Sequence, residues 1–475
     1  MTISRRVALT LFSTLAFTST SALAQVAATQ PIAPSVAPGT LVERLQSALG
    51  LVVLIAIAWG IGRLRNGRVA TPWRTVTWGV GLMAAFTLLV LNFPAVLAVV
   101  NDAINALLGY TRAGAAMVFG NLHEFTIPAT VTTESGGTLK GVAVAGGVVA
   151  FYVLPTIVFF SALTAVAYHL GFMQWIVRGI AWVMSKSMKT SGAETLASAA
   201  NIFVGQTEAP LMVRPFMKSA TNSELMAIMV AGFANIASGV LGIYTEMLQP
   251  FVQNVGGHLA AACFISAPAG LLVAKLLVPE TGTPVTSAGV PYKVEKLDHN
   301  LIDAASRGTS EGLTLALNVG AMLIAFTALI AMANGILGYF SAKLGVVTPA
   351  GPLTIEYMLG WVFAPLAWMT GVPWSESPRV GSLLGVKTVL NEYIAYAGMQ
   401  RGFIADPNYL SPRSALITTY ALCGFANFAS VGIQVGGIAS IVPERRGDLA
   451  KLGMLAMVGG ALATLMAAAM VGIVV

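Results

Sequence analysis

The amino-acid sequence consists mainly of apolar segments that are about as long as a lipid bilayer is thick. Several of them approach or exceed the roughly 20 residues that a helix needs to cross the hydrocarbon core. Lipid offers no partner to a free backbone N–H or C=O group, so a segment that crosses it must bond its backbone internally, as a helix does. Charged residues make up only 9% of the chain. The pattern therefore predicts an all-α polytopic membrane protein.

Short clusters of Lys and Arg separate the apolar segments and indicate their orientation. The cluster at 63–74 follows the first segment and places that end in the cytoplasm. The net charge of +7 therefore reflects orientation signals and does not indicate nucleic-acid binding. We expect both chain termini on the periplasmic side of a bacterial inner membrane and about eight spans, near 44–62, 76–99, 141–168, 222–246, 258–279, 311–340, 412–440 and 452–475. Four basic residues fall outside in this scheme and conflict with it: Arg379, Lys387, Arg401 and Arg413.

Other segments differ from the spans in length and polarity. Residues 102–120 are short and carry charges, which predicts an interfacial or scaffold helix, and residues 126–140 read as a polar loop. The segments 173–189 and 354–372 have the length and composition of helices that lie at a membrane surface.

The N-terminus has the features of a secretory signal peptide. Arg5 and Arg6 precede an apolar core at 7–17, and an A-x-A site at 22–24 would allow cleavage. We expect residues 1–24 to be a signal peptide, followed by a flexible linker at 25–43. The alternative is a short uncleaved anchor.

Two segments are too polar in their interiors to be ordinary spans. Residues 190–218 contain Glu194 and the sequence GQTEAP at 205–210 in their interior. Basic residues lie at both ends of this segment, so both ends are expected in the cytoplasm. A helix–turn–helix that enters and leaves by one face fits this pattern, and residues 374–399 resemble it. Broken backbone at membrane depth is tolerated only where protein buries it or where it lines a cavity. We therefore expect two re-entrant hairpins of opposite orientation.

A heptapeptide occurs twice, as GFANIAS at 232–238 and GFANFAS at 424–430. Each copy follows a hairpin that carries an acid, Glu208 in the first and Glu392 in the second. This arrangement indicates an inverted internal repeat, whose halves meet at a binding site near the bilayer centre.

The chemistry of these residues leaves two interpretations open. A carboxylate near the bilayer centre costs about 2.5–3.5 kcal/mol, so Glu208 and Glu392 need an internal ion pair, a capped turn or a polar ligand. The glycines around each heptapeptide weaken helices, and unwinding would free carbonyl groups that suit a small hard cation such as sodium. Close helix packing through small residues is the alternative. Cys263 and Cys423 lie in apolar segments without a spacing typical of zinc or haem, and no organic cofactor is expected.

Three motifs resemble those of the concentrative nucleoside transporter family: GQTEAPLMVRPFM from 205, LNEYIAYAGM from 390 and CGFANFASVGIQVGGI from 423. The resemblance covers roughly 75–475. It implies uptake of nucleosides driven by a cation gradient, and a homotrimer whose protomers combine a scaffold with a moving transport domain. The scaffold would comprise 44–172 and 280–353. The transport domain would comprise repeats 173–279 and 354–475, with the hairpins at 190–218 and 374–399.

The family resemblance also implies roles for individual residues. At the first hairpin tip, the nucleobase would be faced by Gln206, Thr207 and Glu208. Apolar walls would be formed by Val240 and Phe425. The ribose hydroxyls would be bonded by Glu392, Asn427 and Ser430.

Sodium would be held by the side chain of Asn201, the carbonyl groups of Val204 and Ile236, and position 235. This chain has Asn235 where the resemblance leads us to expect a smaller hydroxyl residue.

The leading hypothesis is a symporter that imports nucleosides with sodium by alternating access. A proton-coupled symporter, in which Glu208 or Glu392 titrates, is the alternative. An intramembrane enzyme and a passive channel are remote possibilities, because the membrane segments contain no recognisable protease motif and a channel does not require inverted hairpins.

Overall fold

The computed structural model describes residues 36, 38–67, 69–123, 126–132, 138–144, 149–152, 154–287, 298–348 and 351–475. The predicted signal peptide at 1–24 and most of the linker at 25–43 lie outside this set. The N-terminal part contains α3 (Leu41–Asn66), α4 (Trp73–Asn92), α5 (Pro94–Phe119), η2 (Gly120–His123), β1 (Thr126–Thr132), β2 (Thr138–Val144), α6 (Val149–Tyr152) and α7 (Leu154–His169).

The first predicted repeat contains α8 (Phe172–Met188), α9 (Gly192–Ala200), η3 (Ala209–Val213), α10 (Arg214–Met217), α11 (Asn222–Ala234), α12 (Ser238–Leu248) and α13 (Val255–Leu277). After it come α14 (Leu301–Lys343), β3 (Val347–Thr348) and β4 (Gly351–Pro352). The second repeat contains α15 (Ile355–Met369), α16 (Ser377–Val389), α17 (Glu392–Ala405), α18 (Pro412–Leu422), α19 (Phe428–Ile441), η4 (Pro443–Arg445) and α20 (Arg446–Val474).

The two repeats place the same elements in the same order. Each has a helix of surface character (α8, α15), a helical hairpin (α9 to α10, α16 to α17), a broken apolar helix (α11–α12, α18–α19) and a long final helix (α13, α20). Side-chain caps set several of these boundaries. In the first repeat, α9 and α11 both begin with a capping box, made by Ser191 with Glu194 and by Thr221 with Glu224.

Six helices among the described residues are long and apolar enough to cross a membrane, or seven if α7 and α8, bent by 78° at their junction, form one span. We expected eight. The difference lies at 141–168, whose beginning forms strand β2 and whose helix α7 starts only at Leu154, and at 412–440, which is divided into the short helices α18 and α19.

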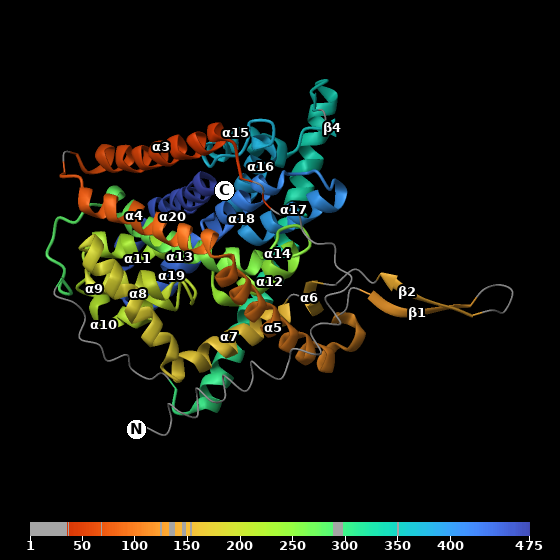
Figure 1. The fold of residues 1–475 in the computed structure, drawn as a ribbon, viewed down its shortest axis with the longest axis horizontal. Coiled ribbons are helices and arrows are strands. Elements are labelled where there is room, and N and C mark those ends of the chain that lie inside the picture. Colours follow the sequence, from red (N-terminus) through yellow and green to blue (C-terminus); the bar gives the residue numbers. More distant parts are fainter. Residues whose placement is uncertain are drawn as a thin grey trace.

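The predicted polar loop at 126–140 is wrong, because Thr126–Thr132 and Thr138–Val144 pair as the antiparallel strands β1 and β2. In Figure 1 this hairpin projects away from the helical body. Threonine and valine together make up four of the seven residues of β1 and three of the seven of β2, and such residues favour extended backbone. The all-α prediction therefore holds for the body of the molecule, with two short two-stranded sheets added in the described residues.

The core is formed by the broken helix α11–α12 and by α13 and α20. The most apolar stretch of α13 is 89% buried and that of α20 is 78% buried, against 6% for α14. Helix α14 packs mainly against α7, where Gly308 and Gly312 lie close to the backbone near Ser161, and it also contacts α15 through a hydrogen bond from Asn334 to Glu356. Large apolar side chains are exposed on the rest of α14, among them Leu317, Ile324 and Met332.

Two of the basic residues that conflicted with the predicted orientation lie inside the protein. Lys387 is 2% exposed and Arg413 is 7% exposed. Arg413 donates to the carbonyl groups of Gly371 and Gly472, at 2.6 and 2.7 Å, and so joins the ends of α15 and α20. These two residues are therefore internal, and counting them as loop charges was wrong.

Candidate functional site

The first broken helix has an extended segment at its centre. Helix α11 ends at Ala234 and α12 begins at Ser238, with Asn235 in extended backbone (φ −122°, ψ 162°). The last carbonyl groups of α11 therefore lack helical partners. The Asn235 side chain donates from Nδ2 to the carbonyl of Ala231 at 3.1 Å, while its Oδ1 is buried and has no partner in the described structure. An acceptor that is buried and free in this way fits a cation ligand.

The tip of the first hairpin is attached to this break. The backbone N–H of Ser238 donates to the carbonyl of Phe203 at 3.4 Å, which brings Val204 alongside residues 235–237. Asn201 ends α9 and is 1% exposed. The structure thus gathers the four residues that were predicted to hold sodium in one buried region.

The hairpin tip also contacts the glycine of the first heptapeptide. A Cβ atom at Gly232 would lie 2.9 Å from Cβ of Gln206 and in collision with the amide of Gln434. Gln434, on α19, donates to the carbonyl of Met229 at 3.0 Å. The Oε1 atoms of Gln206 and Gln434 are both buried without a partner among the described residues. Two amide side chains with unpartnered oxygen atoms therefore lie beside the same glycine.

Thr207 contacts the second broken helix. A Cβ atom added at Gly437 in α19 would lie 2.5 Å from Cγ2 of Thr207. Glu208 beside it is exposed, and its carboxylate accepts a hydrogen bond from the N–H of Gly205 at 3.1 Å. Glu208 therefore has surface that a solute can reach at the hairpin tip.

Glu392 is buried where the two repeats meet. It is the first residue of α17, and the partial positive charge of a helix N-terminus stabilises a carboxylate there. Its Oε1 accepts from the hydroxyl of Tyr244 at 2.9 Å and its Oε2 from Nδ2 of Asn427 at 3.2 Å. Tyr244 belongs to the first repeat and Asn427 to the second, so this carboxylate connects the two.

The second heptapeptide positions Asn427 by capping α19. Oδ1 of Asn427 accepts from the backbone N–H of Ser430 at 2.8 Å, which directs its Nδ2 to Glu392. Ser430 is buried, and Phe425 is half-buried. Val240, on the other broken helix, is 5% exposed. The structure therefore places all eight residues predicted to bind substrate at the hairpin tips or on the broken helices.

Tyr244 was missed by the sequence analysis. Its ring lies on that of Tyr396, with centroids 4.4 Å apart, and its hydroxyl bonds to Glu392. A tyrosine hydroxyl in a buried apolar segment usually needs a partner, and this rule could have identified it. Gln434 carried the same signal, as an amide in an apolar helix.

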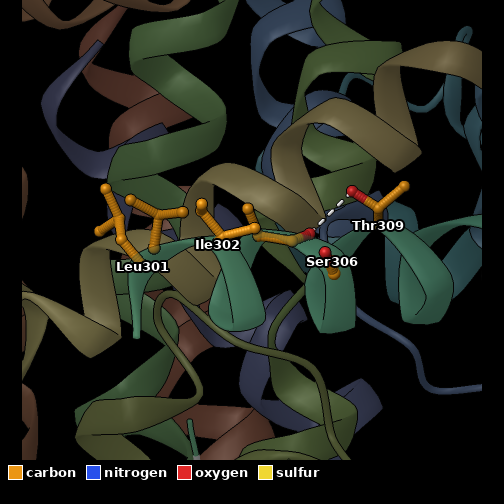
Figure 2. A pocket seen from close by; sticks show the side chains of 6 residues that line it. Leu301, Ile302, Ser306 and Thr309 are labelled. Atoms are coloured by element: carbon orange, nitrogen blue, oxygen red, sulfur yellow. Dashed lines mark hydrogen bonds between the residues drawn. The ribbon is translucent and has the colours of Figure 1, made fainter. Parts of the chain in front are cut away.

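A separate cavity of about 470 Å³ lies between α7 and α14. Figure 2 shows the α14 residues Leu301, Ile302, Ser306 and Thr309 along it. It contains none of the predicted site residues.

Comparison with known proteins agrees with this architecture. The family model described as the Na⁺ dependent nucleoside transporter N-terminus matches residues 49–122, and the corresponding C-terminus model matches residues 258–472. A model described as nucleoside recognition matches residues 150–251. An uncharacterized transporter of Haemophilus influenzae is 41% identical over 441 residues, covering 90% of this chain and 97% of its own length. The chain belongs to the concentrative, Na⁺-dependent nucleoside transporter family.

Solved structures and a mammalian relative support this assignment. CNTnw in an inward-facing, substrate-bound state has a TM-score of 0.78 and 41% identity, covering 90% of this chain and 97% of that one. A CNTnw variant in an intermediate state has a TM-score of 0.79 at 41% identity, covering 91% and 99%. Sodium/nucleoside cotransporter 1 of Mus musculus is 36% identical over 446 residues, covering 91% of this chain and 64% of its own length. The resemblance and the fold class are confirmed, and this protein is a transporter and not an enzyme.

Proposed function

We propose that this concentrative nucleoside transporter imports nucleosides across a bacterial inner membrane together with sodium. Two observations carry the proposal: the buried Glu392 carboxylate accepts hydrogen bonds from Tyr244 and Asn427, and Asn235 at the first helix break has a buried amide oxygen without a partner in the described structure. A polar solute needs such fixed acceptors and donors, and a cation needs such free oxygen atoms.

The ribose is recognised by Glu392, Asn427 and Ser430 in this proposal. A carboxylate oxygen accepts two hydrogen bonds, and each oxygen of Glu392 has one protein partner. The remaining lone pairs suit the 2′- and 3′-hydroxyl groups, which donate strongly to a charged acceptor.

The base is recognised by the first hairpin tip. Gln206 provides a buried amide with a free Oε1, and the carboxylate of the exposed Glu208 lies two residues away. Thr207 completes the polar edge. Val240 and Phe425 then provide apolar surface for the faces of the base.

Sodium is a substrate that binds at the first helix break. Asn201, Val204, Asn235 and Ile236 supply amide and carbonyl oxygen atoms, which are the hard ligands that this ion prefers. The free Oδ1 of Asn235 fits the ion, so an amide here serves in place of the expected hydroxyl.

Transport requires the two repeats to move against a scaffold. We assign 44–172 and 280–353 to the scaffold, and 173–279 and 354–475 to the transport domain, in a homotrimer with both termini periplasmic. At the boundary, Thr164 of α7 bonds Ser238 of α12 at 2.9 Å, and Gly242 packs on Thr156 and Phe160. Small residues along α12 permit the close contact that a sliding surface needs.

Uptake of labelled uridine into proteoliposomes at fixed pH tests this function. We expect an inward sodium gradient to drive accumulation, and a panel of unlabelled nucleosides to compete for it. Uptake that ignores sodium but rises when the outside is made acidic would replace sodium with protons. Equilibration without accumulation under either gradient would indicate a passive channel.

A further inference from the structure

Lys387 is a buried charge with no role in the nucleoside site just described. It lies on α16, is 2% exposed, and donates from Nζ to the carbonyl of Ala421 at 2.9 Å and to the hydroxyl of Thr464 at 3.1 Å. In the described structure no carboxylate lies within ion-pair distance of it. A buried ammonium group without an ion pair is costly, so its surroundings must compensate the charge in another way.

The compensation comes from the end of a helix. Helix α18 ends at Leu422 where the second heptapeptide interrupts the span. The last four carbonyl groups of a helix lack helical partners and carry its partial negative charge. Ala421 and Thr419 are among these four, and they accept from Lys387 and from the hydroxyl of Tyr396. The ammonium group therefore lies at the negative end of the second broken helix.

The first broken helix has the same negative end without a lysine. Among the described carbonyl groups at 231–236, that of Ala231 accepts from the side chain of Asn235. That of Ile236 accepts from the thiol of Cys263 at a long distance of 4.0 Å. Oδ1 of Asn235 stays free. One helix break thus has a fixed positive charge, and the other has free oxygen atoms and no positive charge in the described contacts.

The two breaks are in direct contact. A Cβ atom at Gly424, in the second heptapeptide, would lie 2.8 Å from the carbonyl oxygen of Phe233 and 2.7 Å from Cγ2 of Thr464. Thr464 is also a partner of Lys387. The ammonium group and the proposed sodium site therefore share one buried core, in which two positive charges repel each other more strongly than in water.

We propose that the ammonium group of Lys387 is a built-in cation at the second helix break, where it takes the place that a mobile sodium ion takes at the first. It thereby limits the carrier to one sodium ion per nucleoside. The inference rests on the proposed sodium coupling. It assigns Lys387 a positioning role, because its ammonium group bonds the carbonyl of Ala421 and so fixes the end of α18.

The sodium coupling ratio tests this role. Full-length protein is placed in proteoliposomes with the membrane potential held at zero, and the steady uridine accumulation is measured at an imposed tenfold sodium gradient. Free energies of coupled ions add, so one sodium ion supports about tenfold accumulation and two support about a hundredfold. We expect the one-ion value for the wild type. Lys387→Gln replaces the ammonium group with an amide and frees the carbonyl of Ala421 and the hydroxyl of Thr464. For this variant we expect more than tenfold uridine accumulation and a second bound ²²Na⁺ per protomer.

Matched variants separate charge from packing. Lys387→Arg keeps the charge, and Lys451→Gln removes an exposed lysine from α20, so both should keep one bound sodium ion. Coupling of two sodium ions to each nucleoside in the wild type would overturn the inference, even if Lys387→Gln does not fold. One bound sodium ion in a folded Lys387→Gln would also overturn it. Absence of any sodium-driven accumulation in the wild type would instead reject the underlying sodium coupling.

Discussion

Substitution of Glu392 by glutamine tests the nucleoside site most sharply, because it keeps the shape of the side chain and removes the charge. The carboxylate accepts from Tyr244 at 2.9 Å and from Asn427 at 3.2 Å. A glutamine has one acceptor oxygen, so its NH₂ group must face one of these two donors. Asn427 cannot turn its own amide to adapt without losing the bond from the N–H of Ser430.

The expected loss follows from these contacts. Hydrogen bonds to charged groups contribute about 1.5–3 kcal/mol each, and the ribose hydroxyls lose such an acceptor. This corresponds to about 10- to 150-fold weaker uridine binding. Tyr244→Phe keeps the carboxylate and removes a hydroxyl that bonds Glu392 and that has no ribose contact in the proposal, so we expect a smaller, indirect loss of about two- to twelvefold.

Equilibrium uridine binding to purified protein measures both effects, and a size-exclusion profile identical to the wild type controls for folding. Wild-type affinity in Glu392→Gln would remove Glu392 from the site. A larger loss in Tyr244→Phe than in Glu392→Gln would show that the tyrosine, and not the charge, carries recognition.

Three further substitutions test other parts of the structure. Asn235→Ala removes a free buried acceptor and should weaken the sodium dependence of uptake by roughly two- to tenfold, whereas Asn235→Ser should retain coupling. Equal sodium dependence in the wild type and both variants would exclude Asn235 from the sodium site. Gly232→Ala places a methyl group against Gln206 and should weaken uridine binding, while Gly432→Ala, with open space around it, should not; equal effects would contradict the packing. Arg413→Ala should lower the melting temperature, because each bond it loses to a carbonyl group contributes about 1.5–3 kcal/mol; an unchanged melting curve would show that these bonds add no stability.

Much of the architecture was predictable from the sequence because it depends on local patterns. Apolar length identified most spans, and the repeated heptapeptide identified the two broken helices. The acids in GQTEAP and LNEYIAY identified the hairpin tips. The predicted surface helices at 173–189 and 354–372 agree with α8 and α15 to within a few residues.

The errors arise where distant contacts decide the outcome. Lys387 and Arg413 look like loop charges, but carbonyl groups at the ends of remote helices accept their hydrogen bonds. The segment 126–140 has a polar composition typical of a loop, and only the pairing of its two halves makes it a hairpin.

The duplicated asparagines show the same limit within the site. Asn235 and Asn427 occupy the same place in the heptapeptide, yet the first bonds back to the helix before the break and the second caps the helix after it. Local sequence gives both the same prediction. Their different partners leave a free oxygen for an ion at one break and direct an amide to Glu392 at the other.

Uridine affinity measured with and without sodium tests this division most directly. Calorimetry on the purified wild type in sodium and in choline should show tighter binding in sodium, since coupling between two sites is reciprocal. Asn235→Ala should lose most of the sodium effect while it still binds uridine, and Glu392→Gln should lose uridine binding in both salts. Uridine affinity that is the same in sodium and choline for the wild type, or a sodium effect of wild-type size in Asn235→Ala, would contradict the assignment of the ion to the first break.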